Sequence, residues 1–266
     1  MLSVFQYDFM KRAFIAGILV AIIVPLIGTV VINRKTSTIG DALSHTTLAG
    51  VFFGIILGFN PLLGGILISV VSAFLIEFFR KKFPQNGDMA TAIIMSLGVG
   101  LSSLLSDFVQ GAQNFESFLF GSIVSVTKTD LLIIAGVSLV TLVAFYYFYY
   151  GLIFVSIDKT SSRLAGVKNN IIEYSFTLLL AVVIAISARI VGVLIVSSLM
   201  ILPVASAMYL GKSYKSTTII SLVFGLVYFI SGLMLAAVKN LKPGGSIILT
   251  SVIGLLLVIM LKGKKQ

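Results

Sequence analysis

Long apolar runs, separated by short groups of charged residues, glycine or proline, limit the folding of this chain more than any other feature. Crossing the hydrocarbon core of a membrane takes roughly 20 apolar residues in a helix. Membrane strands would instead alternate over about ten residues, which these runs do not do. The sequence therefore predicts an all-α integral membrane protein, a polytopic bundle of about nine transmembrane helices. We place them at 13–32, 40–59, 61–79, 88–109, 130–155, 171–188, 190–210, 216–238 and 245–261.

The composition supports this fold class. Hydrophobic residues make up 58% of the 266 positions and charged residues only 11%, whereas soluble domains average about 45–50% and about 25%. We therefore expect residues 1–266 to form a single transmembrane domain, with no room for a soluble catalytic domain. The chain is not expected to be an enzyme, and any ATP hydrolysis would belong to a partner. The absence of cysteine excludes disulfides and thiolate metal sites.

The distribution of basic residues indicates how the bundle is oriented. Thirteen of the 19 Lys and Arg residues follow odd-numbered runs, and cytoplasmic loops carry the excess of such residues. The N-terminus is therefore expected outside and the C-terminus in the cytoplasm, with the protein in the cell membrane. Anionic lipid and acidic partner surfaces account for the net charge of +10, so no nucleic-acid partner is expected.

Two polar stretches interrupt the apolar pattern. Residues 110–129 lie outside in this topology, and the FLFGSI sequence within them fits an interfacial or re-entrant helix. The number of spans is therefore eight or nine. Residues 156–170 form the most polar cytoplasmic stretch between spans.

The one histidine of the chain has a carboxylate four residues before it. Asp41 and His45 stack on one face of a helix, about 40° apart at 100° per residue. Gly50, Gly54 and Gly58 lie about 140–220° from His45 by the same arithmetic and form a small-residue stripe for close helix packing. One side of this span is thus expected to dock against a neighbour, and the other to offer two metal ligands.

A structural explanation of this pair remains open. His45 could hydrogen-bond Asp41, and Asp41 could cap the span or interact with its dipole. Two ligands also fall short of the four that zinc usually takes. Water or the second chain of a symmetric dimer would have to supply the others.

Several other residues are weaker candidates for a role in transport. Pro203 is expected to kink the seventh span. Asp88 and Glu173 open the fourth and sixth spans, where the helix dipole accounts for a carboxylate, although a gating role is open. Met95 and Met200 could be soft metal ligands, but apolar packing is favoured because divalent cations of this kind prefer oxygen and nitrogen.

Three sequence motifs resemble one family. GDALSH at 40–45, GDMATAIIMSLGVGL at 87–101 and VGVLIVSSLMILPVASA at 191–207 are similar to segments of the integral-membrane permeases of metal-uptake ABC transporters. The polar stretch SIDKTSSRLAGV at 156–167 resembles the cytoplasmic loop whose short helix sits in a groove of the ATPase subunit. The resemblance covers nearly the whole chain.

The resemblance implies partners and site residues. It implies a homodimer of permease chains, two cytoplasmic ABC ATPase subunits and an extracytoplasmic metal-binding protein, with ATP-driven alternating access. Asp41 and His45 then correspond to metal ligands in the translocation path. Two departures are Ala49, where many members have proline, and serine in the coupling loop where alanine is usual. The residues carried over to the ATPase-coupling loop are Asp158, Ser162, Arg163, Gly166 and Lys168.

The identity of the metal rests on weaker signals. YDFMKRA, SHTTLAGV and FLFGSI look most like the zinc-uptake branch, so Zn²⁺ is favoured, with Mn²⁺ next and Fe²⁺ also compatible with imidazole and carboxylate ligands. No permanently bound cofactor is expected. The alternative is a stand-alone secondary metal transporter or channel that uses Asp41 and His45 as a relay.

Overall fold

The computed structural model describes residues 8–83, 85–109, 126–239 and 241–263. Every regular element in these ranges is a helix, and nine of the helices are long and apolar enough to cross a membrane. This confirms the predicted all-helical membrane bundle. The stretch expected to form an interfacial or re-entrant helix lies largely outside the described residues. The nine helices are α1 (Asp8–Asn33), α2 (Ile39–Ile56), α3 (Pro61–Lys82), α4 (Gly87–Ser106), α6 (Lys128–Ile157), α8 (Asn169–Val191), α9 (Val193–Leu210), α10 (Tyr214–Lys239) and α11 (Pro243–Gly263).

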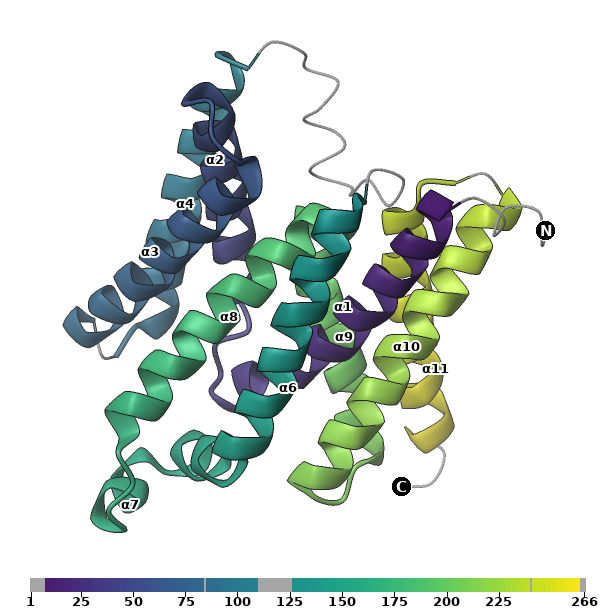
Figure 1. The fold of residues 1–266 in the computed structure, drawn as a ribbon. Helices are drawn as coiled ribbons and strands as arrows, with labels where there is room; N and C mark the ends of the chain where they lie inside the picture. Colours follow the sequence, from purple (N-terminus) through teal and green to yellow (C-terminus); the bar gives the residue numbers. More distant parts are fainter. Residues whose placement is uncertain (1–7, 84, 110–125, 240, 264–266) are drawn as a thin grey trace.

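The helices form two groups that α8 connects (Figure 1). On one side α2 packs extensively against α3 and α4, and on the other α1, α9, α10 and α11 pack together, with α6 against α1. Helix α8 contacts both groups, and a hydrogen bond of 3.1 Å from Ser69 Oγ on α3 to the carbonyl of Ala181 on α8 fixes one of these contacts. A buried polar group in a membrane span needs such a partner.

Side-chain caps set several helix starts. The side chain of Asn60 accepts a hydrogen bond from the backbone nitrogen of Leu62. Helix α3 therefore begins at Pro61, a residue that suits the first helical position. Thr127 and Asp130 form a capping box that starts α6. Gly192, at φ 104°, separates α8 from α9, a backbone angle that glycine adopts at little cost. The turn therefore comes three residues later than the sequence analysis placed it.

A tenth, short helix lies at one end of the bundle. Helix α7 (Lys159–Leu164) falls between α6 and α8, within the polar stretch for which a short helix was expected, and projects from the lower end in Figure 1. Helix α1 begins at the opposite end, whereas α11 finishes at the α7 end. An odd number of spans places the first and last ends of the bundle on opposite sides of the membrane.

Candidate functional site

Helix α2 is buried from Ile39 to Phe52, before its exposed last turn, with one narrow exception. From Ile39 to Phe52 every residue is buried except Asp41 and His45. The two side chains lie one turn apart, as the four-residue spacing requires. Between Ile39 and Phe52 the open face of this helix therefore consists of one carboxylate and one imidazole, which are ligand types that divalent transition metals accept.

A residue of α9 joins this pair. Ser197, which is 6% exposed, donates a hydrogen bond from its hydroxyl to the carboxylate of Asp41. The contact fixes one oxygen of Asp41, and hydrogen-bonded carboxylates are better oriented as ligands. Ser197 was not among the residues predicted from the sequence, where it is one of three serines in an otherwise apolar span.

Close backbone contacts hold α2 on two other sides. A Cβ atom added to Gly50 would lie 2.4 Å from the carbonyl oxygen of Gly64 on α3, and one added to Gly64 would lie 2.3 Å from that of Gly50. On α4, a Cβ added to Gly98 would lie 2.8 Å from the backbone nitrogen of Thr46 and 3.0 Å from the carbonyl carbon of His45. The backbone that carries His45 is thus supported directly by α4.

One member of the predicted glycine stripe does not take part in packing. Gly54 lies against Pro61 at the start of α3, but Gly58 follows the end of α2 and has φ 74°. A Cβ added there would meet no atom within 4 Å. The prediction of close packing at Gly58 is wrong, because α2 ends at Ile56 and the glycine serves the turn instead.

The site in a single chain is incomplete for a metal ion. Among the residues that the structure describes, no group of three or more His, Cys, Asp or Glu side chains is placed to hold a metal. Met200 is 1% exposed, and its methyl group would lie 2.6 Å from a Cβ added to Gly40. It therefore packs against Gly40, the residue before Asp41. Pro203 is buried within α9.

The loop around α7 is held by its own hydrogen bonds. Asp158 accepts from the backbone nitrogens of Thr160 and Ser161 and so caps α7. These bonds and one from the Ser161 hydroxyl, which has the largest effect, lower the pKa of Asp158. Gly166 has φ 79° and turns the chain after the helix.

Buried and exposed residues of this loop have different roles. Ser162, expected among the coupling residues, is fully buried and donates to Asn169 Oδ1 at 3.1 Å, so it holds the loop's shape. Arg163 and Lys168 are exposed, as is Leu164 at 85%. The sequence analysis did not single out Leu164.

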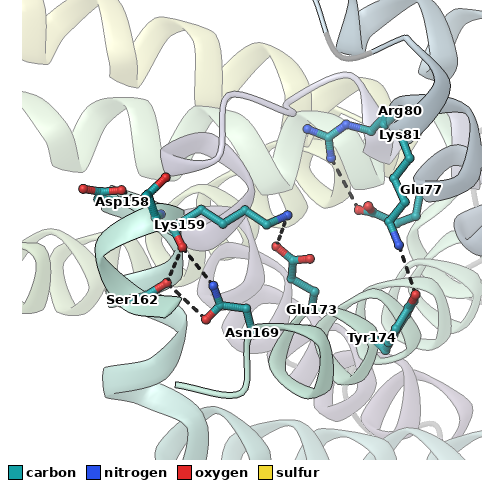
Figure 2. Close-up of polar contacts among 10 residues, drawn as sticks. Glu77, Arg80, Lys81, Asp158, Lys159, Ser162, Asn169, Glu173 and Tyr174 are labelled. Carbon is teal, nitrogen blue, oxygen red and sulfur yellow. Dashed lines mark hydrogen bonds and ion pairs between the residues drawn. The ribbon is translucent and has the colours of Figure 1, made fainter. Parts of the chain in front are cut away.

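A polar cavity of about 580 Å³ lies at the α7 end of the bundle. Two ion pairs line it: Lys159 with Glu173 at 2.6 Å, and Arg80 with Glu77 at 3.4 Å (Figure 2). Glu173 therefore pairs with a lysine of α7. Asp88 is exposed in the first turn of α4, where the helix dipole favours a carboxylate. The residues that line the cavity are Asn33, Arg34, Lys35, Glu77, Arg80, Lys81, Gly87, Val155, Ser156, Lys159 and Glu173.

Comparison with known proteins connects this arrangement with metal transport. Residues 6–262 match the ABC 3 transport family. A probable metal transport system membrane protein of Treponema pallidum is 35% identical over 257 residues, which is 96% of each chain. The manganese import system permease protein ScaB of Streptococcus gordonii is 28% identical, over 98% of this chain and 94% of its own length.

A solved structure has the same fold over nearly the whole chain. It is PsaBC from Streptococcus pneumoniae in complex with Fab, at a TM-score of 0.87 and 28% identity, covering 97% of this chain and 95% of that one. The likeness therefore includes both groups of helices and is not confined to one of them.

Proposed function

Because the chain belongs to the ABC 3 transport family, we propose that it is the membrane permease of an importer that moves a divalent metal ion into the cytoplasm. The ion passes Asp41 and His45, and ATP hydrolysis on a separate subunit drives alternating access. The observation that carries this proposal is the open face of α2, where these two residues alone are not buried between Ile39 and Phe52. Ionisable residues inside a membrane mark ion pathways.

Manganese is the metal that the relatives favour. The streptococcal relative carries manganese in its name, whereas the zinc expected from the sequence receives no support from the relatives. Affinity order alone does not select a metal in a cell, because geometry, ligand type and availability contribute. We therefore propose Mn²⁺ as the cargo, with Zn²⁺ and Fe²⁺ as competitors to be measured beside it.

A second copy of the chain would complete the metal site. One chain offers a carboxylate and an imidazole, and two chains related by a twofold axis offer two of each. The extensive apolar surface of α4, α6 and α11 is available to lipid and to this second copy. The C-terminus of the chain would lie in the cytoplasm. A metal-binding protein on the outer side of the membrane would deliver the ion.

Helix α7 would be the contact with the ATPase. The exposed residues of α7 and of the turn after it combine an apolar side chain, Leu164, with the cations Arg163 and Lys168. A single apolar anchor surrounded by polar groups is a common form of protein interface.

The test is transport by purified components. The chain is reconstituted with its ATPase and binding protein in liposomes, and uptake of Mn²⁺, Zn²⁺ and Fe²⁺ is measured with and without ATP. We expect ATP-dependent Mn²⁺ uptake, lost in His45→Ala and Asp41→Asn although both still bind the ATPase. A matched control is Ser106→Ala at the far end of α4. Undiminished uptake by both site variants would exclude the pathway.

The same experiment distinguishes the alternative of a stand-alone secondary transporter. Such a protein would move the metal without the ATPase, and deletion of residues 158–167 would leave its uptake intact. The importer instead requires both the ATPase and this loop.

A further inference from the structure

Glu173 on α8 joins the bundle to the short helix α7. Its Oε1 lies 2.6 Å from Nζ of Lys159, the first residue of α7, and its side chain is only 15% exposed. Exposed ion pairs contribute little to stability, but a carboxylate that is mostly buried loses much more when its partner is removed. This pair therefore constrains where α7 lies relative to α8.

Neutral hydrogen bonds beside this pair hold the shape of the loop independently of charge. Asn169, the first residue of α8, donates from Nδ2 to the carbonyl of Lys159 at 2.9 Å and accepts from Ser162. Removal of the charge on Glu173 leaves these bonds in place. The ion pair and the fold of the loop can thus be tested separately.

The next residue on α8 makes the connection to α3. Tyr174 accepts a hydrogen bond of 3.1 Å from Nζ of Lys81, and its ring lies 6.1 Å from that of Phe74. Figure 2 shows Glu173 directed toward α7 and Tyr174 toward α3. Helix α3 in turn contacts the backbone of α2 through Gly64 and Gly50. One turn of α8 therefore contacts α7 on one side and, on the other, a helix that packs against α2.

Glu173 also acts on a second cation. Arg34, in the connection between α1 and α2, lies with its guanidinium carbon 4.7 Å from the centre of the Phe176 ring. Within the described residues, its Nε and Nη2 atoms are buried and have no hydrogen-bond partner. Burial lowers the pKa of Arg34, and Glu173 is the largest influence in the opposite direction. The same carboxylate thus pairs with a cation of α7 and lines the same cavity as a cation next to α2.

We propose that Glu173 is a positioning residue for transport, which holds α7 to the bundle so that movement of α7 reaches α3 and α2. This inference rests on the proposed function, because it requires an ATPase that moves α7. Glu173 does not touch the metal. Spatial connection alone does not establish energetic coupling, so the test measures coupling directly.

The experiment uses the full transporter in liposomes and measures Mn²⁺ taken up per ATP hydrolysed. Glu173→Gln and Lys159→Met preserve side-chain size while removing charge. We expect each to lower this ratio about fivefold or more, within the usual range for coupled sites, with binding to the ATPase retained. Lys159→Arg should keep the wild-type ratio. The double variant should match Glu173→Gln alone, because the ion pair of Lys159 is already lost once residue 173 is neutral.

A matched control lies in the same cavity. Arg80→Gln breaks the ion pair with Glu77, but both of those residues belong to α3, so the ratio should stay at the wild-type value. A wild-type ratio in Glu173→Gln overturns the proposal, as does a double variant with the summed losses of the two single variants. Absence of ATP-dependent uptake in the wild type would instead contradict the proposed function. Thermal unfolding of each variant separates a loss of folding from a loss of coupling.

Discussion

Ser197 on α9 donates a hydrogen bond to Asp41 on α2, across 156 positions of sequence. The contact places the two motifs GDALSH and VGVLIVSSLMILPVASA at one point in the bundle. Oδ1 of Asp41 accepts this hydrogen bond, and the other carboxylate oxygen is left for a ligand. Helix α9 therefore has a part in the geometry of the proposed metal site, whose two candidate ligands both belong to α2.

The first prediction concerns this hydrogen bond. Ser197→Ala should weaken Mn²⁺ binding by about tenfold or more, as losses of outer-shell partners usually do, while Ser197→Thr should retain most of it. Isothermal titration of the purified permease measures the affinity. Ser198→Ala, at the next position, is the control. Equal affinities for Ser197→Ala and wild type would contradict a positioning role for Ser197.

The second prediction concerns the contact of α4 with the backbone at His45. A methyl group added in Gly98→Ala would lie 2.7 Å from Cγ2 of Thr46, and overpacking of this kind costs about 1–3 kcal/mol. We expect a lower Tm and reduced uptake. Gly100→Ala, two residues along α4, meets no atom within 4 Å and should leave both unchanged. A normal Tm for Gly98→Ala would show that α4 can move away freely.

The third prediction concerns the proline of α9. Pro203 is buried within the helix, and proline removes an interior hydrogen bond and bends the axis. Pro203→Ala should impair uptake, because Ser197 and the half of α9 beyond the proline would change their relative direction. Uptake is compared at matched expression, with Tm as a check on folding. An unchanged uptake rate would mean that the bend has no part in transport.

The fourth prediction concerns the pH dependence of α7. The pKa of Asp158 is lowered, first by the Ser161 hydroxyl and then by the backbone bonds. A carboxylate with a depressed pKa stabilises the folded loop above its unfolded pKa, and the effect is lost as pH falls through the folded pKa. Asp158 therefore stays ionised between about pH 5 and pH 8, and its titration should leave binding of the ATPase unchanged over this range.

Substitution of Asp158 tests the same point at neutral pH. Asp158→Ala removes the cap of α7, which costs helix stability, and should therefore weaken ATPase binding. Asp158→Asn keeps an acceptor oxygen and should lie between alanine and wild type. Thr160→Ala, which keeps the backbone donor, is the control. Tight binding of the ATPase by the alanine variant at pH 7 would show that the cap at Asp158 does not contribute to docking.

The sequence predicted the spans well and their ends less well. Apolar length alone defines a membrane helix, which is why nine spans could be placed. The ends depend on local backbone geometry, such as the positive φ of Gly192 and Gly58. A window of hydrophobicity does not contain that information, so the turn before α9 was placed too early and Gly58 was assigned to the span and not to the turn after it.

The candidate site was predictable only where it is local. Asp41 and His45 are four residues apart, and helical geometry places them together. Ser197 reaches Asp41, and Lys81 reaches Tyr174, through packing between distant segments. Charge patterns in one sequence do not determine such pairs. Glu173 could thus be singled out from the sequence, but not its bond to Lys159.

The open face of α2 has a consequence for how selectivity can change. In a twofold assembly each substitution at this face enters the coordination sphere twice, because both copies carry it. Replacing one carboxylate by an amide therefore removes two negative charges around the ion. A transporter built in this way can move between metals only in large steps, and finer tuning must come from residues such as Ser197 that adjust a ligand without replacing it.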